Sequence, residues 1–175
     1  MRFSILVGSA IIFATSPVLA AEPTGEWLVE NGAAHIRIEN CGGALWGVTS
    51  WEKVPGKDTE NPDPTKRNRP TLGIPILIDM KPAADGVRWD GQVYNAENGK
   101  TYTANITLKD PNTLRIQGCV LGFLCGGENW TRVQAAVPQA TARQPKGKDG
   151  KNAPKGKTAV SEICSHVANL ARATH

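Results

Sequence analysis

Four cysteines, Cys41, Cys119, Cys125 and Cys164, are the residues of this sequence whose chemistry depends most directly on spacing. Cys119 and Cys125 stand six positions apart around a glycine-centred turn, a spacing open to a metal site, a redox pair or a disulfide. Zinc sites need ligand pairs at tight spacing, but the sequence has no C-x-x-C and no histidine close to this pair. We therefore expect no metal ion, and the choice between a disulfide and free thiols depends on the compartment.

The first 20 residues indicate that compartment. The stretch MRFSILVGSAIIFATSPVLA has an early cation, Arg2, then an apolar run, then small or aliphatic residues at Val18 and Ala20. These features predict a secretory signal peptide cleaved after Ala20, and the run is shorter than the ~20 apolar residues that a membrane-spanning helix needs. Because an exported chain enters an oxidising environment, we expect a disulfide between Cys119 and Cys125 that clamps a hairpin.

The common catalytic motifs do not occur in this sequence. It contains no G-x-S-x-G, no H-E-x-x-H, no phosphate-binding P-loop and no G-x-G-x-x-G. No catalytic residue and no cofactor is therefore nominated, and we expect a protein that is not an enzyme.

One long connection, VPGKDTENPDPTKRNRP at 54–70, contains four prolines and many charged residues. It could be a binding loop that offers Asp63, Arg67 and Arg69 to an anionic or polar ligand. Alternatively, it is a solvated loop whose Asn-Pro and Asp-Pro steps build turns. Composition by itself favours the solvated loop.

The elements that must position these residues are strands. In TYTANITLK at 101–109, polar residues alternate with apolar ones, which predicts a strand with one buried face. Similar segments at 25–29, 35–40, 44–52, 72–80, 86–95, 113–120 and 128–133 give about eight strands, and turn residues of the hairpin kind separate most of them. Between 25 and 133 no segment has a helical period, so an antiparallel sheet with one apolar face must close on itself or form a sandwich.

The alternation also predicts which side chains point inward. If the sheet closes, they form an apolar interior that can hold one small ligand, because about eight strands leave little more space than side chains fill. We expect a lipid-like ligand held by non-directional contacts. The predicted cavity wall consists of Ile36, Ile38, Ile74, Ile76, Ile78, Trp89, Val93, Tyr102, Ala104, Ile106, Leu108 and Ile116.

Charge is distributed unevenly along the chain. Residues 21–134 carry 12 Lys and Arg against 14 Asp and Glu, whereas residues 135–175 carry 7 against 2. The basicity belongs to the tail, so the folded part gives no reason to expect nucleic-acid binding. Segment 135–157 has the composition of a disordered basic linker, which could contact anionic lipid, and 158–175 has the spacing of a short helix.

Several segments together resemble a known family. They are GEWL (25–28), IRIENCGGALWG (36–47), NPDPTKRNRPTLGIPIL (61–77), WDGQVYNAENGKTYTANITL (89–108) and LRIQGCVLGFLCGGENWTRV (114–133). In order and spacing they are similar to the DUF2147 family of small exported bacterial proteins. The resemblance covers 24–134, leaves out the tail, and implies a periplasmic protein with a lipocalin-like barrel and no established biochemical role. It also makes a specific job for the 61–70 loop, structural or binding, as plausible as a loop that is only solvated.

The resemblance has two further implications. Trp27, in Gly-x-Trp, looks like the first-strand tryptophan of lipocalins, over which an arginine of the last strand lies, and Arg132 is in the matching place. Where the family usually reads Cys-Gly-x-x-Leu-Cys-Gly, this chain has Trp46 in place of the second cysteine, which leaves Cys164 as the candidate partner of Cys41.

Two functions remain open from the sequence. The first is a barrel that binds a small apolar or amphipathic ligand. The second is a cell-envelope interaction protein with a solid barrel, acting through the 54–70 loop or the basic tail. The sequence names neither the ligand nor the oligomeric state.

Overall fold

The structure is a computed structural model that describes residues 22–120, 124–134 and 158–172 of the 175-residue chain. The predicted signal peptide, 1–20, and the predicted basic linker, 135–157, lie outside the described residues.

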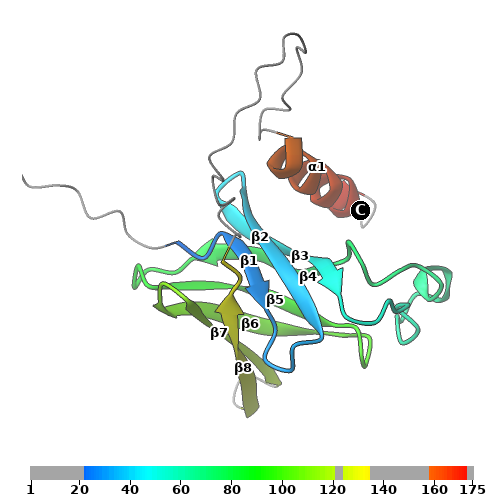
Figure 1. Cartoon of the computed structure of the whole chain (residues 1–175), viewed down its shortest axis with the longest axis horizontal. Coiled ribbons are helices and arrows are strands. Elements are labelled where there is room, and N and C mark those ends of the chain that lie inside the picture. Colours follow the sequence, from blue (N-terminus) through cyan, green and yellow to red (C-terminus); the bar gives the residue numbers. More distant parts are fainter. Residues whose placement is uncertain (1–21, 121–123, 135–157, 173–175) are drawn as a thin grey trace, which may run out of the picture.

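Eight strands form a closed antiparallel barrel in which each strand pairs with its neighbours in sequence and β1 pairs with β8 (Figure 1). The predicted barrel fold is therefore confirmed. The strands are β1 (Gly25–Leu28), β2 (Ala34–Cys41), β3 (Ala44–Glu52), β4 (Pro75–Pro82), β5 (Arg88–Asn95), β6 (Lys100–Asp110), β7 (Thr113–Val120) and β8 (Leu124–Arg132).

The barrel has two ends that the turns define. One end carries the β2–β3, β4–β5 and β6–β7 turns, and the chain enters β1 from the same end. We call it the closed end. The opposite end, with the β1–β2 and β5–β6 turns and the long β3–β4 connection, is the open end. At the closed end Gly42 and Gly43 link β2 to β3 with φ values of 70° and 96°, which a side chain would disfavour.

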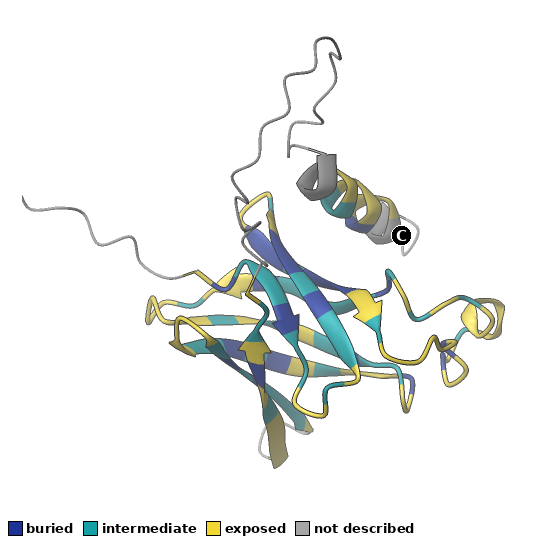
Figure 2. Ribbon diagram, viewed as in Figure 1, coloured by how far each residue is buried: buried dark blue, intermediate teal, exposed yellow. Residues whose placement is uncertain are grey.

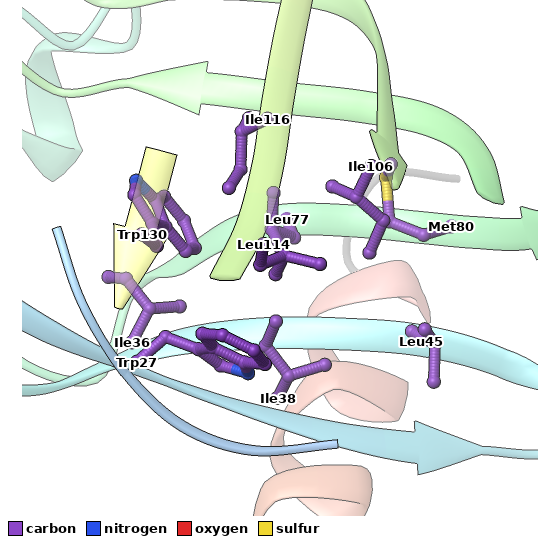
Figure 3. Packing of buried hydrophobic residues seen from close by; sticks show 10 residues of the cluster. All are labelled: Trp27, Ile36, Ile38, Leu45, Leu77, Met80, Ile106, Leu114, Ile116 and Trp130. Carbon is purple, nitrogen blue, oxygen red and sulfur yellow. The ribbon is translucent and has the colours of Figure 1, made fainter. Parts of the chain in front are cut away.

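The core fills the barrel between these ends (Figure 3). It consists of Trp27, Ile36, Ile38, Leu45, Leu77, Met80, Ile106, Leu114, Ile116 and Trp130. Trp27, Ile38 and Ile106 have no accessible surface. A side chain beside a void large enough for a water molecule would have accessible surface, so no such void touches these three residues. Around these residues the barrel is packed solid.

Strand β4 departs from the predicted alternation. Ile74, Ile76 and Ile78 were expected to point inward together, but Leu77 and Met80 occupy the core, both with no accessible surface. Ile78 pairs with Gln92 and lies on the other face. The reason is that the register shifts on both sides of β4, and Asp79 adopts a φ of 51°, so a strict period of two does not hold.

Two helices complete the fold of the described residues. The 3-10 helix η1 (Pro64–Lys66) lies in the β3–β4 connection, and α1 (Thr158–Arg172) forms where the tail predicts a helix. Helix α1 lies beside the β2–β3 hairpin, to which the disulfide Cys41–Cys164 joins it (Figure 1). In the described ranges no helix is long and apolar enough to cross a membrane.

Candidate functional site

The closed end brings together Trp27 and Arg132, the pair that the lipocalin resemblance implies. The Arg132 guanidinium carbon lies 4.2 Å from the centre of the Trp27 ring, and Trp27 Nε1 donates to Pro23 O at 2.7 Å. Arg132 also donates to three carbonyl oxygens, those of Pro111 at 2.6 Å, Thr24 at 2.7 Å and Glu22 at 2.7 Å. This end of the interior is therefore sealed by the indole and by a guanidinium that has partners for all its nitrogens.

Part of the predicted cavity wall is packed core. Ile36, Ile38, Ala104, Ile106 and Ile116 point inward as expected, but all five are buried. Ile38 and Ile106 touch no accessible space at all, so the prediction that they line a cavity is wrong. The physical reason lies in the large partners that share this level, Trp27, Trp130, Leu77 and Met80, which fill the space between them.

The remaining inward positions are less covered. Val93 and Tyr102 lie toward the open end, whereas Trp89 and Leu108 lie beside the β4–β5 and β6–β7 turns of the closed end. Trp89, Val93 and Leu108 are half-buried and pack against the edge of the core. Tyr102 is half-buried too, and its hydroxyl accepts a hydrogen bond from Asn98 Nδ2 at 3.0 Å. Ile74 is buried just before β4, and Ile76 packs against the core beside the irregular start of that strand.

At the open end, most of β8 is not paired with β1. Only Trp27 with Arg132 and Leu28 with Thr131 pair β1 with β8 in the described part of the chain, so the rest of β8 runs past β1 (Figure 1). Val120 and Leu124, which pair across β7 and β8, keep 46% and 59% of their surface exposed. Figure 2 shows the free end of β8 as exposed. Apolar surface is thus left open beside the interior.

Small residues form a row across the strands in this part of the barrel. Gly91, Ala104, Gly118 and Gly126 lie opposite one another on four successive strands. Space beside Gly91 is taken by Met80 and the β4 backbone, and Gly118 lies against Val93. A Cβ atom added at Gly126 would meet no atom of the described residues within 4 Å. In the described structure, open space therefore lies beside Gly126.

One polar side chain, Glu128, shares this inward surface, and the sequence analysis missed it. It pairs with Ile116 and stands two residues before the buried Trp130, whose Nε1 donates to Glu128 Oε1 at 2.5 Å. The signal was available in the sequence, because alternation from Trp130 places Glu128 on the same face. Open space, exposed apolar side chains and one carboxylate together make the open end the candidate site.

The β3–β4 connection is held beside this end by a buried polar network. Asp58 has no accessible surface, and its carboxylate accepts from Tyr94 Oη at 2.5 Å and Asn61 Nδ2 at 2.7 Å. Arg69 adds a hydrogen bond from Nε at 2.9 Å and an ion pair from Nη2 at 2.8 Å. The loop also lies against the β5–β6 turn, since a Cβ atom on Gly99 would stand 1.8 Å from Glu60 O.

Protonation equilibria in this network follow from its contacts. Burial by itself would raise the pKa of Asp58, but the hydrogen bonds from Tyr94 and Asn61 and the pairing with Arg69 outweigh burial and hold that pKa below its ordinary value. Burial first, and then the hydrogen bond to the Asp58 carboxylate, raise the pKa of Tyr94 to about 12. Asp58 is therefore ionised and Tyr94 protonated at neutral pH.

The three loop residues proposed as binding groups have structural contacts. Asp63 caps η1 by accepting from Thr65 N at 3.0 Å, and Arg67 Nε donates to Asn61 O at 2.8 Å. Arg69 pairs with Asp58. Of the two jobs that the resemblance allowed for this loop, these contacts supply the structural one.

Both predicted disulfides are present. Cys119–Cys125 joins β7 to β8 near the free end of their hairpin, and Cys41–Cys164 ties α1 to the end of β2. A groove of about 350 Å³ lies beside the second bridge, lined by Asn40, Cys41, Gly42, Trp46, Cys164, Val167 and Ala168. No ionisable side chain lines it, so we do not take it as the main site. Among the described residues no group of His, Cys, Asp and Glu could hold a metal ion.

The fold and the sealed end define a class, the lipocalin-like barrels. Protein HP1028 from the human pathogen Helicobacter pylori, described as belonging to the lipocalin family, superposes with a TM-score of 0.59. The alignment covers 66% of this chain and 85% of that protein, at 20% sequence identity, which shows a shared fold. No curated protein matches the sequence.

Within that class the chain belongs to the DUF2147 family, described as uncharacterized proteins conserved in bacteria. The family model matches residues 25–132, which is the whole barrel from the start of β1 to the end of β8. Helix α1 and the cysteine that ties it to the barrel lie beyond the match.

Proposed function

We propose that this protein is a periplasmic binding protein that holds a small apolar or amphipathic molecule at the open end of its barrel and catalyses no reaction. The observation that carries the proposal is the contrast within the interior: core residues such as Ile38 have no accessible surface, whereas Val120 and Leu124 remain about half exposed beside the open space at Gly126. Apolar surface rimmed by a few polar groups is what a ligand of this kind covers.

Further support comes from the rim. The buried Asp58 network holds the β3–β4 loop in one place, and the Cys119–Cys125 bridge holds the exposed hairpin. A preorganised rim lowers the conformational entropy that binding would otherwise cost. The alternative is an interaction protein acting through the 54–70 loop or the basic tail. The loop has less support for that role, because Asp63, Arg67 and Arg69 are engaged within the loop itself. The basic linker 135–157 lies outside the described residues.

The binding function is tested by filling the open end. Gly126→Trp should abolish binding of a neutral fluorescent probe, N-phenyl-1-naphthylamine, because the new side chain would occupy the open space without meeting a neighbour. Asn129→Trp, an exposed position on the same strand but the opposite face, is the matched control and should bind as the parent does. Unchanged probe binding by Gly126→Trp would contradict the proposal, provided that thermal unfolding shows both variants folded.

Location has its own test. The two disulfides and the bacterial family are consistent with export into the periplasm. The intact mass of protein recovered from a periplasmic extract should correspond to a chain that begins at Ala21. A mass that retains residues 1–20 would overturn this part of the proposal.

A further inference from the structure

We propose that the open end selects amphipathic ligands that carry an ammonium head group, and that Glu128 is the residue that selects them. This inference rests on the binding function proposed above and adds the chemical class of the ligand. It depends on three features of Glu128: its position, the one carboxylate oxygen that accepts a hydrogen bond, and the absence of a cationic partner among the described residues.

Glu128 lies on the inner face of β8 at the edge of the core. Its partner across β7 is Ile116, which is buried in the core cluster, and Trp130 on the same face is buried as well. Gly126, two residues toward the open end, borders open space. The carboxylate is half-buried, so it stands where the packed interior ends and the exposed apolar surface begins.

Only one of the two carboxylate oxygens has a partner in the described structure. Oε1 accepts the indole hydrogen of Trp130 at 2.5 Å, which fixes the side chain against the wall. Among the described residues no hydrogen bond or ion pair involves Oε2. An ionised carboxylate has about four acceptor positions, so Glu128 can still accept strong hydrogen bonds from a ligand.

The two buried carboxylates among the described residues are paired with arginine. The fully buried Asp58 pairs with Arg69 at 2.8 Å, and the buried Glu39 pairs with Arg37 at 2.6 Å. Glu128 has no such partner within the described ranges. The basic side chain that shares its face of β8, Arg132, is held over Trp27 by three backbone carbonyls and forms no ion pair with it in the described structure.

An ammonium ligand would supply the missing cation. Its head group would donate to Glu128 Oε2, and its apolar chain would lie along Gly126 toward Leu124 and Val120. A neutral alcohol of the same length would keep the apolar contact and lose the charge-assisted bond, and an anionic head group would be repelled. For a partly exposed pair, the preference of ammonium over alcohol should be roughly tenfold.

The experiment compares three ligands with one chain length, decylamine, decanol and decanoate, by their displacement of N-phenyl-1-naphthylamine from the full exported protein at pH 7. The parent should bind decylamine roughly tenfold more tightly than decanol, with decanoate weakest. Glu128→Gln should bind decylamine and decanol within about twofold of each other while its affinity for decanol stays that of the parent. Glu97→Gln makes the same change of charge on an exposed residue of the β5–β6 turn and should keep the full preference.

The outcomes separate this inference from the proposed function. If all three ligands bind but the parent shows no preference for decylamine, or if Glu128→Gln keeps that preference, Glu128 does not select and the binding function still stands. If neither the probe nor any of the three ligands binds, both proposals are overturned. Should Glu128→Gln fail to fold, the parent's own order of affinities decides the ligand class, and the preference should weaken at high salt.

Discussion

Trp27 at the closed end of the barrel has no accessible surface, whereas Leu124 at the open end keeps 59% of its surface exposed. Both residues belong to strands of one closed sheet and stand on its inner face. The closed end is filled by large side chains and sealed by Arg132, and the open end has glycines and a lone carboxylate. Closure of the sheet therefore does not by itself decide how completely each end of the barrel is covered. Residue size at each level does.

The largest expected effect comes from breaking the closed end. Trp27→Ala should lower the free energy of unfolding by about 3 to 5 kcal/mol, because it removes a fully buried indole and leaves a cavity. Leu124→Ala at the open end is the matched control and should cost less than about 0.5 kcal/mol. Urea unfolding measures both. Equal losses for the two variants would show that the ends do not differ in packing.

Removing the seal comes next. Arg132→Met keeps an unbranched stem over the indole but removes hydrogen bonds to three carbonyl oxygens, so the free energy of unfolding should fall by about 2 to 4 kcal/mol. Probe binding at the open end should not change in the folded variant. A variant with parental stability would mean that the guanidinium contributes nothing to the seal.

The rim should respond to pH through Asp58. Because the folded-state pKa of Asp58 is lowered, its stabilising contribution is present above the unfolded pKa, about 3.8, and is lost as pH falls through the folded value. Asp58→Asn should therefore cost about 2 to 3 kcal/mol near neutral pH. The difference in unfolding free energy between parent and variant, measured from pH 7 downward, should shrink below that pKa. A difference independent of pH would contradict this account.

The smallest effect concerns the hairpin at the open end. Changing both Cys119 and Cys125 to serine opens a seven-residue ring, which the loop-entropy relation values at about 2.4 kcal/mol at most. The ladder between β7 and β8 remains in the variant, so we expect a smaller loss and an intact barrel. Thermal unfolding and probe binding should be measured together. Loss of the fold would mean that the bridge, rather than strand pairing, holds this hairpin.

Local patterns predicted much of this protein. Alternation located the strands, because a sheet with one buried face requires a period of two. The Gly-x-Trp segment and the spacing of Arg132 indicated the sealed end through the resemblance, and the cysteines indicated both bridges. Pattern failed in β4, where Leu77 points into the core and Ile78, expected there, lies on the other face. An irregular residue such as Asp79, with a φ of 51°, shifts the face of every residue after it, and nothing in the local sequence marks it.

The candidate site shows the same limit. Glu128 stands two residues before Trp130, so the sequence predicts that both side chains point inward. Whether Glu128 has a cationic partner depends on the side chains of every neighbouring strand. Tyr94 sits on the outer face of β5, and only the fold brings it to Asp58, 36 residues earlier in the chain. No spacing rule connects residues of separate elements.

The sequence by itself determined the strands, the antiparallel order, the family and the cysteines available to pair, because each depends on neighbours along the chain or on a matching motif. Only the tertiary structure decided which inward residues meet in a solid core and which face open space. That outcome depends on how side chains from different strands share one volume, and the volume exists only after the sheet has closed.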